Sequence, residues 1–220
     1  MKKIILGLIC SILILGVATG CGNGEEGKTS KYMKPVTYVE NNDFNIVGLT
    51  TPDENGIIKS IPNRPFYLIA VDNNEIVDAV LLDSDYKSQK NNQKYYKISM
   101  LEFYMNCDSS LNYNGKESQY NINLLMSVSD PVKFFESSNI MSTDTSNNLF
   151  NGFTVKDLFN NSLKKELENN LNEIIIEYLE ENKLEFSPSL DLGNHITDSL
   201  DELIRPTKGI EIVDVNLNLK

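Results

Sequence analysis

The sequence predicts an α+β fold in a single domain: a mixed or antiparallel sheet, a long amphipathic helix, and a shorter helix before a C-terminal strand. Three observations support this prediction. Residues 120–129 alternate between apolar and polar side chains, as in a strand with one buried face. Residues 155–182 repeat apolar side chains at intervals of three and four, as in an amphipathic helix. A second helical stretch at 195–204 leads into residues 209–219, which alternate again.

The N-terminus has the pattern of an export signal. Lys2 and Lys3 precede an uncharged stretch, rich in Ile and Leu, that runs from Ile4 to Val17. As a helix this stretch would be roughly 21 Å long, which is well short of the ~30 Å hydrocarbon core of a bilayer. We therefore expect residues 1–20 to be removed after export.

Small residues and a cysteine follow the apolar stretch. Ala18, Thr19 and Gly20 precede Cys21, and this order resembles the lipobox of bacterial lipoproteins. The resemblance implies that Cys21 carries a palmitate-type lipid. The small, polar and charged residues that follow predict a flexible tether, and we expect the lipidated cysteine and tether to span residues 21–37. The resemblance also implies anchoring at the extracytoplasmic face of the cell membrane. Two alternatives remain open: an ordinary signal peptide, or an uncleaved anchor in which Cys21 is incidental.

Charge and cysteine content limit the classes of partner. The chain has a net charge of −11, and without Lys2 and Lys3 it has 18 basic and 31 acidic side chains, a net charge of −13. Such a surface repels phosphate backbones and anionic lipid headgroups. We therefore expect that the protein does not bind nucleic acid and that it contacts the membrane only through the lipid. With Cys10 in the signal and Cys21 lipidated, Cys107 is left without a disulfide partner.

The domain is expected to span residues 38–220, and its first part is predicted to be extended. Two short strands flank a turn at 52–56, and the apolar runs of 66–82 form a hairpin around Asp72-Asn73-Asn74 with both arms buried on both faces. A loop follows at 83–93, then extended chain at 94–107. Residues 108–117 are interpreted as a turn with its corner at Asn114-Gly115.

The helices have recognisable ends. Asp130 is a predicted N-cap with Pro131 in the first turn of a short helix. Thr154 is expected to cap the long helix, which we predict to run for about 28 residues with a bend near Asn169-Asn170. The chain is then expected to be extended over 185–192, and Pro206 to end the second helix. On the last strand Val213, Val215, Leu217 and Leu219 should share one face.

The sequence offers no pattern of catalytic or metal-binding residues. His195 is the one histidine, and no G-x-S-x-G motif accompanies it. The polar loops at 83–85 and 142–148 could hold calcium, but neither has the spacing of an EF-hand loop. We therefore expect a non-enzymatic protein without a metal or cofactor. His195 buried beside a serine and an aspartate would instead favour an enzyme.

The order of elements from residue 120 onwards resembles the SPFH, or band 7, domain of stomatins, prohibitins and flotillins. The family has a strand that ends in a hydrophobic-x-Asp-Pro step, and later a helix that closes on Gly-Ile before a terminal strand. Asp130-Pro131 and Gly209-Ile210 lie at those places, and the resemblance covers about 65–219. Members of the family usually continue into a coiled coil that drives ring assembly. None follows Gly209 here, so we expect a monomer or a small homo-oligomer.

The resemblance and the lipobox together imply a function. The chain is expected to be a lipid-anchored scaffold or interaction module with protein partners. The alternative is a lipoprotein that binds a solute or a component of the cell envelope, and a deep pocket with convergent polar groups would favour it.

Overall fold

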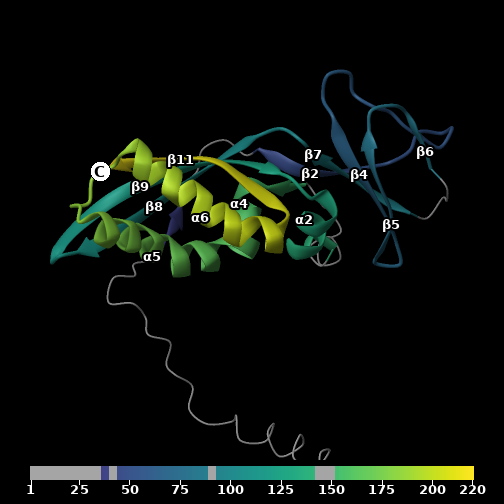
Figure 1. Cartoon of the computed structure of the whole chain (residues 1–220). Helices are drawn as coiled ribbons and strands as arrows, with labels where there is room; N and C mark the ends of the chain where they lie inside the picture. Colours follow the sequence, from purple (N-terminus) through teal and green to yellow (C-terminus); the bar gives the residue numbers. More distant parts are fainter. Residues whose placement is uncertain (1–35, 40–43, 89–92, 142–151) are drawn as a thin grey trace, which may run out of the picture. The chain divides into compact units, whose positions relative to one another are not determined.

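The predicted alternating strand is the centre of an antiparallel four-stranded sheet. The computed structural model describes residues 36–39, 44–88, 93–141 and 152–220, which belong to one compact unit. The order of strands in this sheet is β1-β8-β9-β11. Their bounds are Thr37–Tyr38 for β1, Phe103–Tyr113 for β8, Lys116–Val128 for β9 and Ile210–Leu219 for β11 (Figure 1).

The hairpin of β8 and β9 is longer than predicted. The corner at Asn114-Gly115 is confirmed, and both residues have the positive φ of a two-residue hairpin turn. The interpretation of 108–113 as part of the turn is wrong, because β8 continues to Tyr113, which pairs with Lys116. Cross-strand pairing of these serine- and asparagine-rich residues outweighs their low strand propensity.

A five-stranded antiparallel sheet, in the order β10-β2-β7-β4-β5, contains the predicted hairpin of 66–82. A small two-stranded sheet pairs β3 with β6. The strands of the two sheets are β2 (Asn45–Thr50), β3 (Ile57–Ile58), β4 (Phe66–Asp72), β5 (Glu75–Leu82), β6 (Tyr86–Lys87), β7 (Lys94–Ser99) and β10 (Phe153–Thr154).

The two arms of that hairpin differ in burial. In β4 four consecutive residues from Leu68 to Val71 are buried, so this strand is covered on both faces as predicted. For β5 the prediction is wrong, because β5 lies at the edge of the sheet and exposes Val77 and Leu81. Its apolar composition alone could not distinguish an edge strand from a central one.

The helices confirm the predicted order and caps. Helix α2 covers Pro131–Ser137, and the side chain of Asp130 accepts a hydrogen bond from the Lys133 amide at 3.0 Å. The long helical stretch comprises α4 (Val155–Leu158), a π-helical turn η1 (Phe159–Leu163) and α5 (Lys164–Asn182). Thr154 caps it in a capping box with Asp157. Helix α6 covers Leu190–Lys208.

Two details of the helices differ from expectation. The irregularity of the long helix is the π-helical turn at η1, and Asn170 remains helical, with its side chain donating to the Glu166 carbonyl at 2.7 Å. Pro206 does not end α6. It lies in the last turn, and the helix starts earlier than expected because Ser189 caps the Leu192 amide. Residues 190–192 are therefore helical rather than extended.

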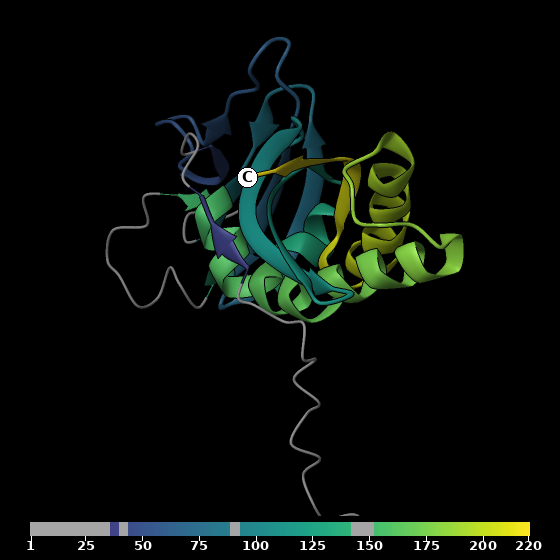
Figure 2. The same ribbon diagram turned by 90° about the vertical axis from the view of Figure 1, so that its left-hand side faces the viewer.

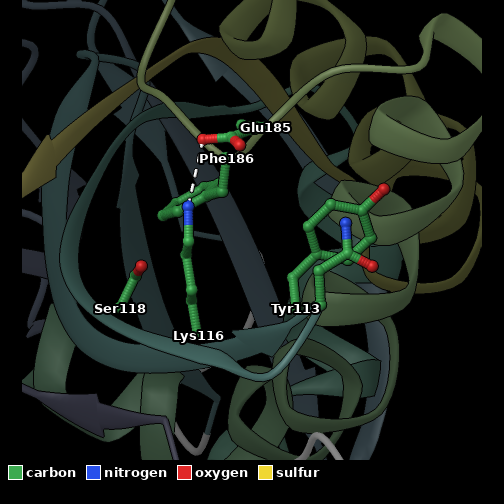
Figure 3. A pocket seen from close by; sticks show the side chains of 6 residues that line it. Tyr113, Lys116, Ser118, Glu185 and Phe186 are labelled. Carbon is green, nitrogen blue, oxygen red and sulfur yellow. Dashed lines mark hydrogen bonds and ion pairs between the residues drawn. The ribbon is translucent and has the colours of Figure 1, made fainter.

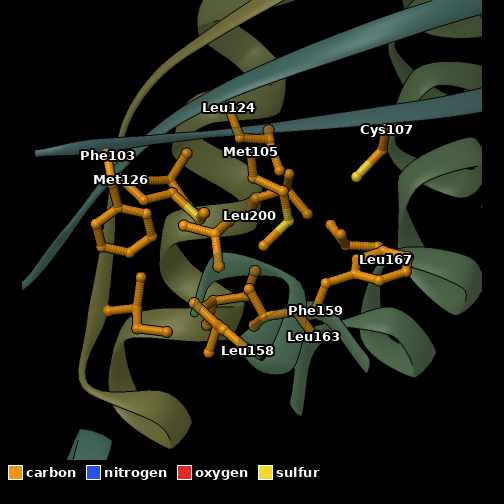
Figure 4. Close-up of a cluster of buried hydrophobic side chains, with 14 of the residues drawn as sticks. Phe103, Met105, Cys107, Leu124, Met126, Leu158, Phe159, Leu163, Leu167 and Leu200 are labelled. Carbon is orange, nitrogen blue, oxygen red and sulfur yellow. The ribbon is translucent and has the colours of Figure 1, made fainter. Parts of the chain in front are cut away.

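One apolar core joins both larger sheets to the helices. Buried side chains of β8 and β9 point toward α4, η1, α5 and α6 (Figure 4). The shared face predicted for residues 120–128 is confirmed, since all five apolar side chains are buried: Tyr120, Ile122, Leu124, Met126 and Val128. A smaller core around Leu68, Ala70, Leu82 and Tyr95 lies on the other face of the five-stranded sheet, together with Ile58 of β3.

The last strand carries a bulge that the alternation did not predict. Ile212 pairs with Met126 and Asp214 with Leu125, so Val213 is the extra residue. Val213 is exposed, and the buried side chains of β11 are Ile210, Ile212, Val215 and Leu217. The predicted shared face of 213–219 is thus wrong for Val213 and confirmed for Val215, Leu217 and Leu219, although Leu219 lies at the end of the strand and is exposed.

The two short motifs of the sequence contact each other directly. The Gly209 carbonyl accepts hydrogen bonds from the amides of Ser129 and Asp130, both at 3.0 Å. Gly209 has φ 66°, and a Cβ there would lie 2.3 Å from the Asp130 carbonyl oxygen. The start of α2 and the end of α6 can therefore meet only if residue 209 is glycine.

Gly209→Ala is expected to lower the free energy of unfolding of residues 22–220 by about 3 kcal/mol or to prevent folding. A left-handed conformation costs a residue with a Cβ roughly 1–2 kcal/mol, and the backbone clash adds to this cost. Urea unfolding followed by circular dichroism measures the loss.

Gly115→Ala is the matched control. Gly115 also has a positive φ, of 76°, but nothing lies within 4 Å of the position of its Cβ. The free energy of unfolding of this variant should fall only by the cost of the left-handed conformation, roughly 1–2 kcal/mol. Equal losses in the two variants would show that the close approach at Gly209 does not contribute.

Candidate functional site

One face of the four-stranded sheet carries polar side chains from three neighbouring strands. Helices α5 and α6 lie together on the opposite side of this sheet (Figures 1 and 2). Alternate residues of β8, β9 and β11 point away from the helices and are half-buried or exposed. We call this surface the outer face, and its residues are Tyr104, Asn106, Asp108, Asn121, Asn123, Leu125, Asn216 and Asn218.

Strand register aligns the polar residues of the outer face in two rows. Asn106 of β8 is opposite Asn123 of β9, which is opposite Asn216 of β11. The next row consists of Asp108, Asn121 and Asn218. Neighbouring strands lie about 4.8 Å apart, and alternate residues of a strand about 6.8 Å apart. The amide groups therefore form a regular array with these spacings.

The carboxylate in the second row is neutralised within the fold. Burial alone would raise the pKa of Asp108, but hydrogen bonds from Lys220 and Asn121 outweigh it and hold the pKa below its usual value. Asp108 is consequently ionised at neutral pH and paired with the Lys220 ammonium. The row has no net charge as a result.

One amide at the centre of the array lacks a partner within the described part of the chain. The Oδ1 atom of Asn123 is shielded from solvent and accepts no hydrogen bond there. A shielded acceptor without a donor costs about 1–3 kcal/mol. Such a group is open to a donor outside the described residues, either an ordered water or a bound ligand.

An apolar end borders the two rows. Tyr104 is opposite Leu125, which is opposite Asp214 of β11, and the bulged Val213 comes next on that strand. Tyr104 is 61% exposed and Val213 40% exposed. The outer face thus combines uncharged amides with one accessible aromatic ring.

A separate pocket of about 360 Å³ lies at the turn between β8 and β9 (Figure 3). Its walls come from the hairpin end and from the segment that joins α5 to α6. Across it, Lys116 Nζ lies 3.2 Å from Glu185 Oε2. The other lining residues are Tyr113, Asn114, Ser118 and Phe186.

The pocket is open, and its charged groups are weakly held. The side chains of Lys116 and Glu185 are 73% and 86% exposed, so their ion pair contributes little to stability. Phe186 is better fixed, because its ring packs edge-on against Tyr120 at 5.7 Å. The Tyr120 hydroxyl in turn donates to Asn172 on α5 at 2.8 Å. A small molecule with a charged group and an apolar group could displace the exposed pair.

His195 lies at the contact between α5 and α6. It is half-buried on α6, and its ring lies 5.0 Å from that of Tyr178, measured between centroids. Tyr178 is on α5, so this contact joins the two helices. Among the described residues, no hydrogen bond joins His195 to a serine or an aspartate. The arrangement that would favour a hydrolase is therefore not seen there.

Of the two polar loops considered for calcium, the structure describes the one at 83–85. Asp85 Oδ1 accepts a hydrogen bond from the Ser60 amide nitrogen at 3.0 Å, and Asp83 accepts one from the Ser84 hydroxyl. The loop at 142–148 lies outside the described residues. In the described ranges no group of three or more His, Cys, Asp or Glu side chains could hold a metal ion.

The lipobox residues Ala18, Thr19, Gly20 and Cys21 also lie outside the described residues, as does most of the expected tether. Within the described part of the chain, no helix has the length and apolarity to cross a bilayer. Asp130, Pro131, Gly209 and Ile210, in contrast, are brought together at the junction of α2, α6 and β11.

The sequence contained a signal for the outer face that single-strand analysis did not use. Asn121 and Asn123 alternate with apolar residues in β9, as do Asn216 and Asn218 in β11. Alternation places each pair on one face of its strand, but only the register places both pairs side by side.

No protein-family model matches the sequence, and none of the curated proteins matches it significantly.

Cys107 should be unreactive in the folded chain. Burial, together with the nearby charge of Asp108, raises the pKa of its thiol to about 12. The thiol therefore stays protonated at pH 8.5, near the pKa of an exposed cysteine. We expect iodoacetamide at this pH to alkylate Cys107 only after unfolding in urea, as measured by mass spectrometry. Rapid alkylation of the folded protein would contradict the buried position.

Proposed function

We propose that the chain is a non-enzymatic, lipid-anchored interaction module at the extracytoplasmic face of a bacterial cell membrane. The outer face of the four-stranded sheet is its binding surface. The observation that carries the proposal is the pair of aligned polar rows on this face, next to the exposed Tyr104. The described residues place no helix or strand over them.

The anchor part of the proposal rests on the sequence around Cys21. A positively charged start, a short apolar stretch and small residues before a cysteine are together typical of lipoprotein export. The lipid supplies membrane attachment that the acidic domain would not achieve by itself.

The scaffold part of the proposal is supported by the contact between the two motifs. Asp130-Pro131 and Gly209-Ile210 suggested an SPFH-like domain, and in the fold they form one junction between two helices and the sheet. Such a junction explains physically why both motifs would be needed in one domain. We propose membership of that family on this basis, with a monomer or small homo-oligomer as the assembled state.

Cys21→Ser is expected to abolish incorporation of labelled palmitate and to release the protein from the membrane fraction. The thiol of Cys21 is the acceptor of the lipid, and a hydroxyl would not replace it. Metabolic labelling followed by fractionation measures both effects. Cys107→Ala is the matched control, because Cys107 is buried and should leave labelling unchanged. Labelling that persists in Cys21→Ser would refute the anchor.

Binding of a solute is the second candidate function, and the pocket at the β8–β9 turn favours it. A volume of about 360 Å³ lies in the range of small-molecule sites, and two aromatic rings lie near one cation and one anion. A free amino acid with an apolar side chain has a carboxylate for the cation, an ammonium for the anion and an apolar group for the rings.

A pool of free amino acids at millimolar concentration should raise the melting temperature if the pocket binds such solutes. The double variant Lys116→Met with Glu185→Gln should lose this shift and keep its own melting temperature, because the pair is exposed. Thermal unfolding followed by circular dichroism tests both. No shift with any amino acid would exclude this function for the pocket.

A further inference from the structure

The chemistry of the outer face restricts the kind of partner that it fits. Five of its eight residues are asparagines, whose amides donate and accept hydrogen bonds without carrying charge: Asn106, Asn121, Asn123, Asn216 and Asn218. A partner that satisfies them must also present donors and acceptors at short, regular intervals. Hydroxyl groups meet this requirement, because each both donates and accepts.

The net charge of the protein argues against a polyanionic partner. The chain carries −11 overall, and the charged groups beside the rows are largely paired. Asp108 is paired with Lys220, and Glu211 is held by Arg205 at 2.6 Å. Asp214 adds a further negative charge near Leu125. Phosphate-bearing polymers would therefore be repelled, whereas an uncharged polymer would not.

The arrangement of polar and apolar groups argues against a protein partner. Protein interfaces usually have an apolar or aromatic centre and a polar rim. On the outer face the centre is the row Asn106–Asn123–Asn216, and the apolar residues Tyr104 and Leu125 lie at one end.

An aromatic ring beside amides suits a sugar. One side of a pyranose ring is lined by C–H groups, which pack on an aromatic face, and its edge carries hydroxyls. Tyr104 offers the ring, with 61% of its surface exposed, and the adjacent row offers the amides. The unpartnered Oδ1 of Asn123 adds an acceptor that a hydroxyl or acetamido N–H can reach once neighbouring side chains shift.

We propose that the outer face binds an uncharged, hydroxyl-rich glycan chain laid across β8, β9 and β11. Tyr104 stacks on one sugar, and the row Asn106–Asn123–Asn216 hydrogen-bonds the next. This inference rests on the proposed function, because such a glycan meets the protein only on the extracytoplasmic side of the membrane. The glycan is thus the class of partner for the binding surface already proposed.

Isothermal titration calorimetry of the full-length lipid-modified protein in detergent micelles tests the proposal. The probes are chitohexaose, which carries acetamido groups, and cellohexaose, which carries hydroxyls only. We expect at least one of them to bind. Tyr104→Ala and Asn216→Ala should each weaken that binding about fivefold or more, since each removes one stacking or hydrogen-bonding contact.

Asn194→Ala is the matched control. Asn194 is exposed on α6, on the other side of the sheet, and its loss should leave the affinity unchanged. Circular dichroism of every variant should match that of the parent, because Tyr104, Asn216 and Asn194 are all exposed.

Two results would overturn the glycan proposal: binding of neither probe, or binding that is unaffected by both outer-face variants. A protein cross-linked at position 216 in cells would, in the first case, identify a protein as the partner instead. None of these results bears on palmitate labelling of Cys21. Failure of the glycan can thus be distinguished from failure of the lipid-anchored module.

Discussion

The structure depends on one carbonyl group. The Gly209 carbonyl oxygen accepts hydrogen bonds from the amides of Ser129 and Asp130. The end of β9, the start of α2 and the end of α6 therefore meet at a single point. From there β11 runs back along β9 and becomes the edge of the four-stranded sheet. Asn216 and Asn218 are carried into the outer face by this strand, so the geometry of the candidate site follows from a contact at the far end of the sheet.

Strong periodicity made much of the fold predictable. Residues 120–128 and the long helix each repeat at one period over many positions, and a buried face imposes this repeat directly. The caps at Asp130 and Thr154 were predictable because capping is a local hydrogen bond. What was missed depends on distant partners. The strand pairing of 108–113 and the edge position of β5 are decided by what lies beside them, and no local pattern contains that information.

The candidate site was less predictable than the fold for a related reason. The residues first considered for chemistry, such as His195 and the aspartates of 83–85, prove to make ordinary structural contacts. The outer face is assembled from three strands separated by up to about a hundred residues, and none of its residues is unusual alone. The bulge at Val213 also shifts the register of β11, so that even a correct alternation would have placed Val213 wrongly. A site made by register becomes visible only when the strands are paired.

The asparagines of the outer face differ from those that occupy turns of the chain. Five asparagines elsewhere occupy turn positions that favour this residue. Asn63, Asn73, Asn74, Asn114 and Asn139 all have positive φ, which asparagine tolerates better than most residues. In β9 the situation is reversed, because asparagine is disfavoured in strands, and Asn123 also leaves an acceptor unsatisfied within the described residues. A solvated sheet face could be built more stably from threonine or lysine. Asn121 has a structural partner in Asp108, but Asn123 has none among the described residues. At these aligned positions of adjacent strands, neighbouring amides can act together on one extended ligand.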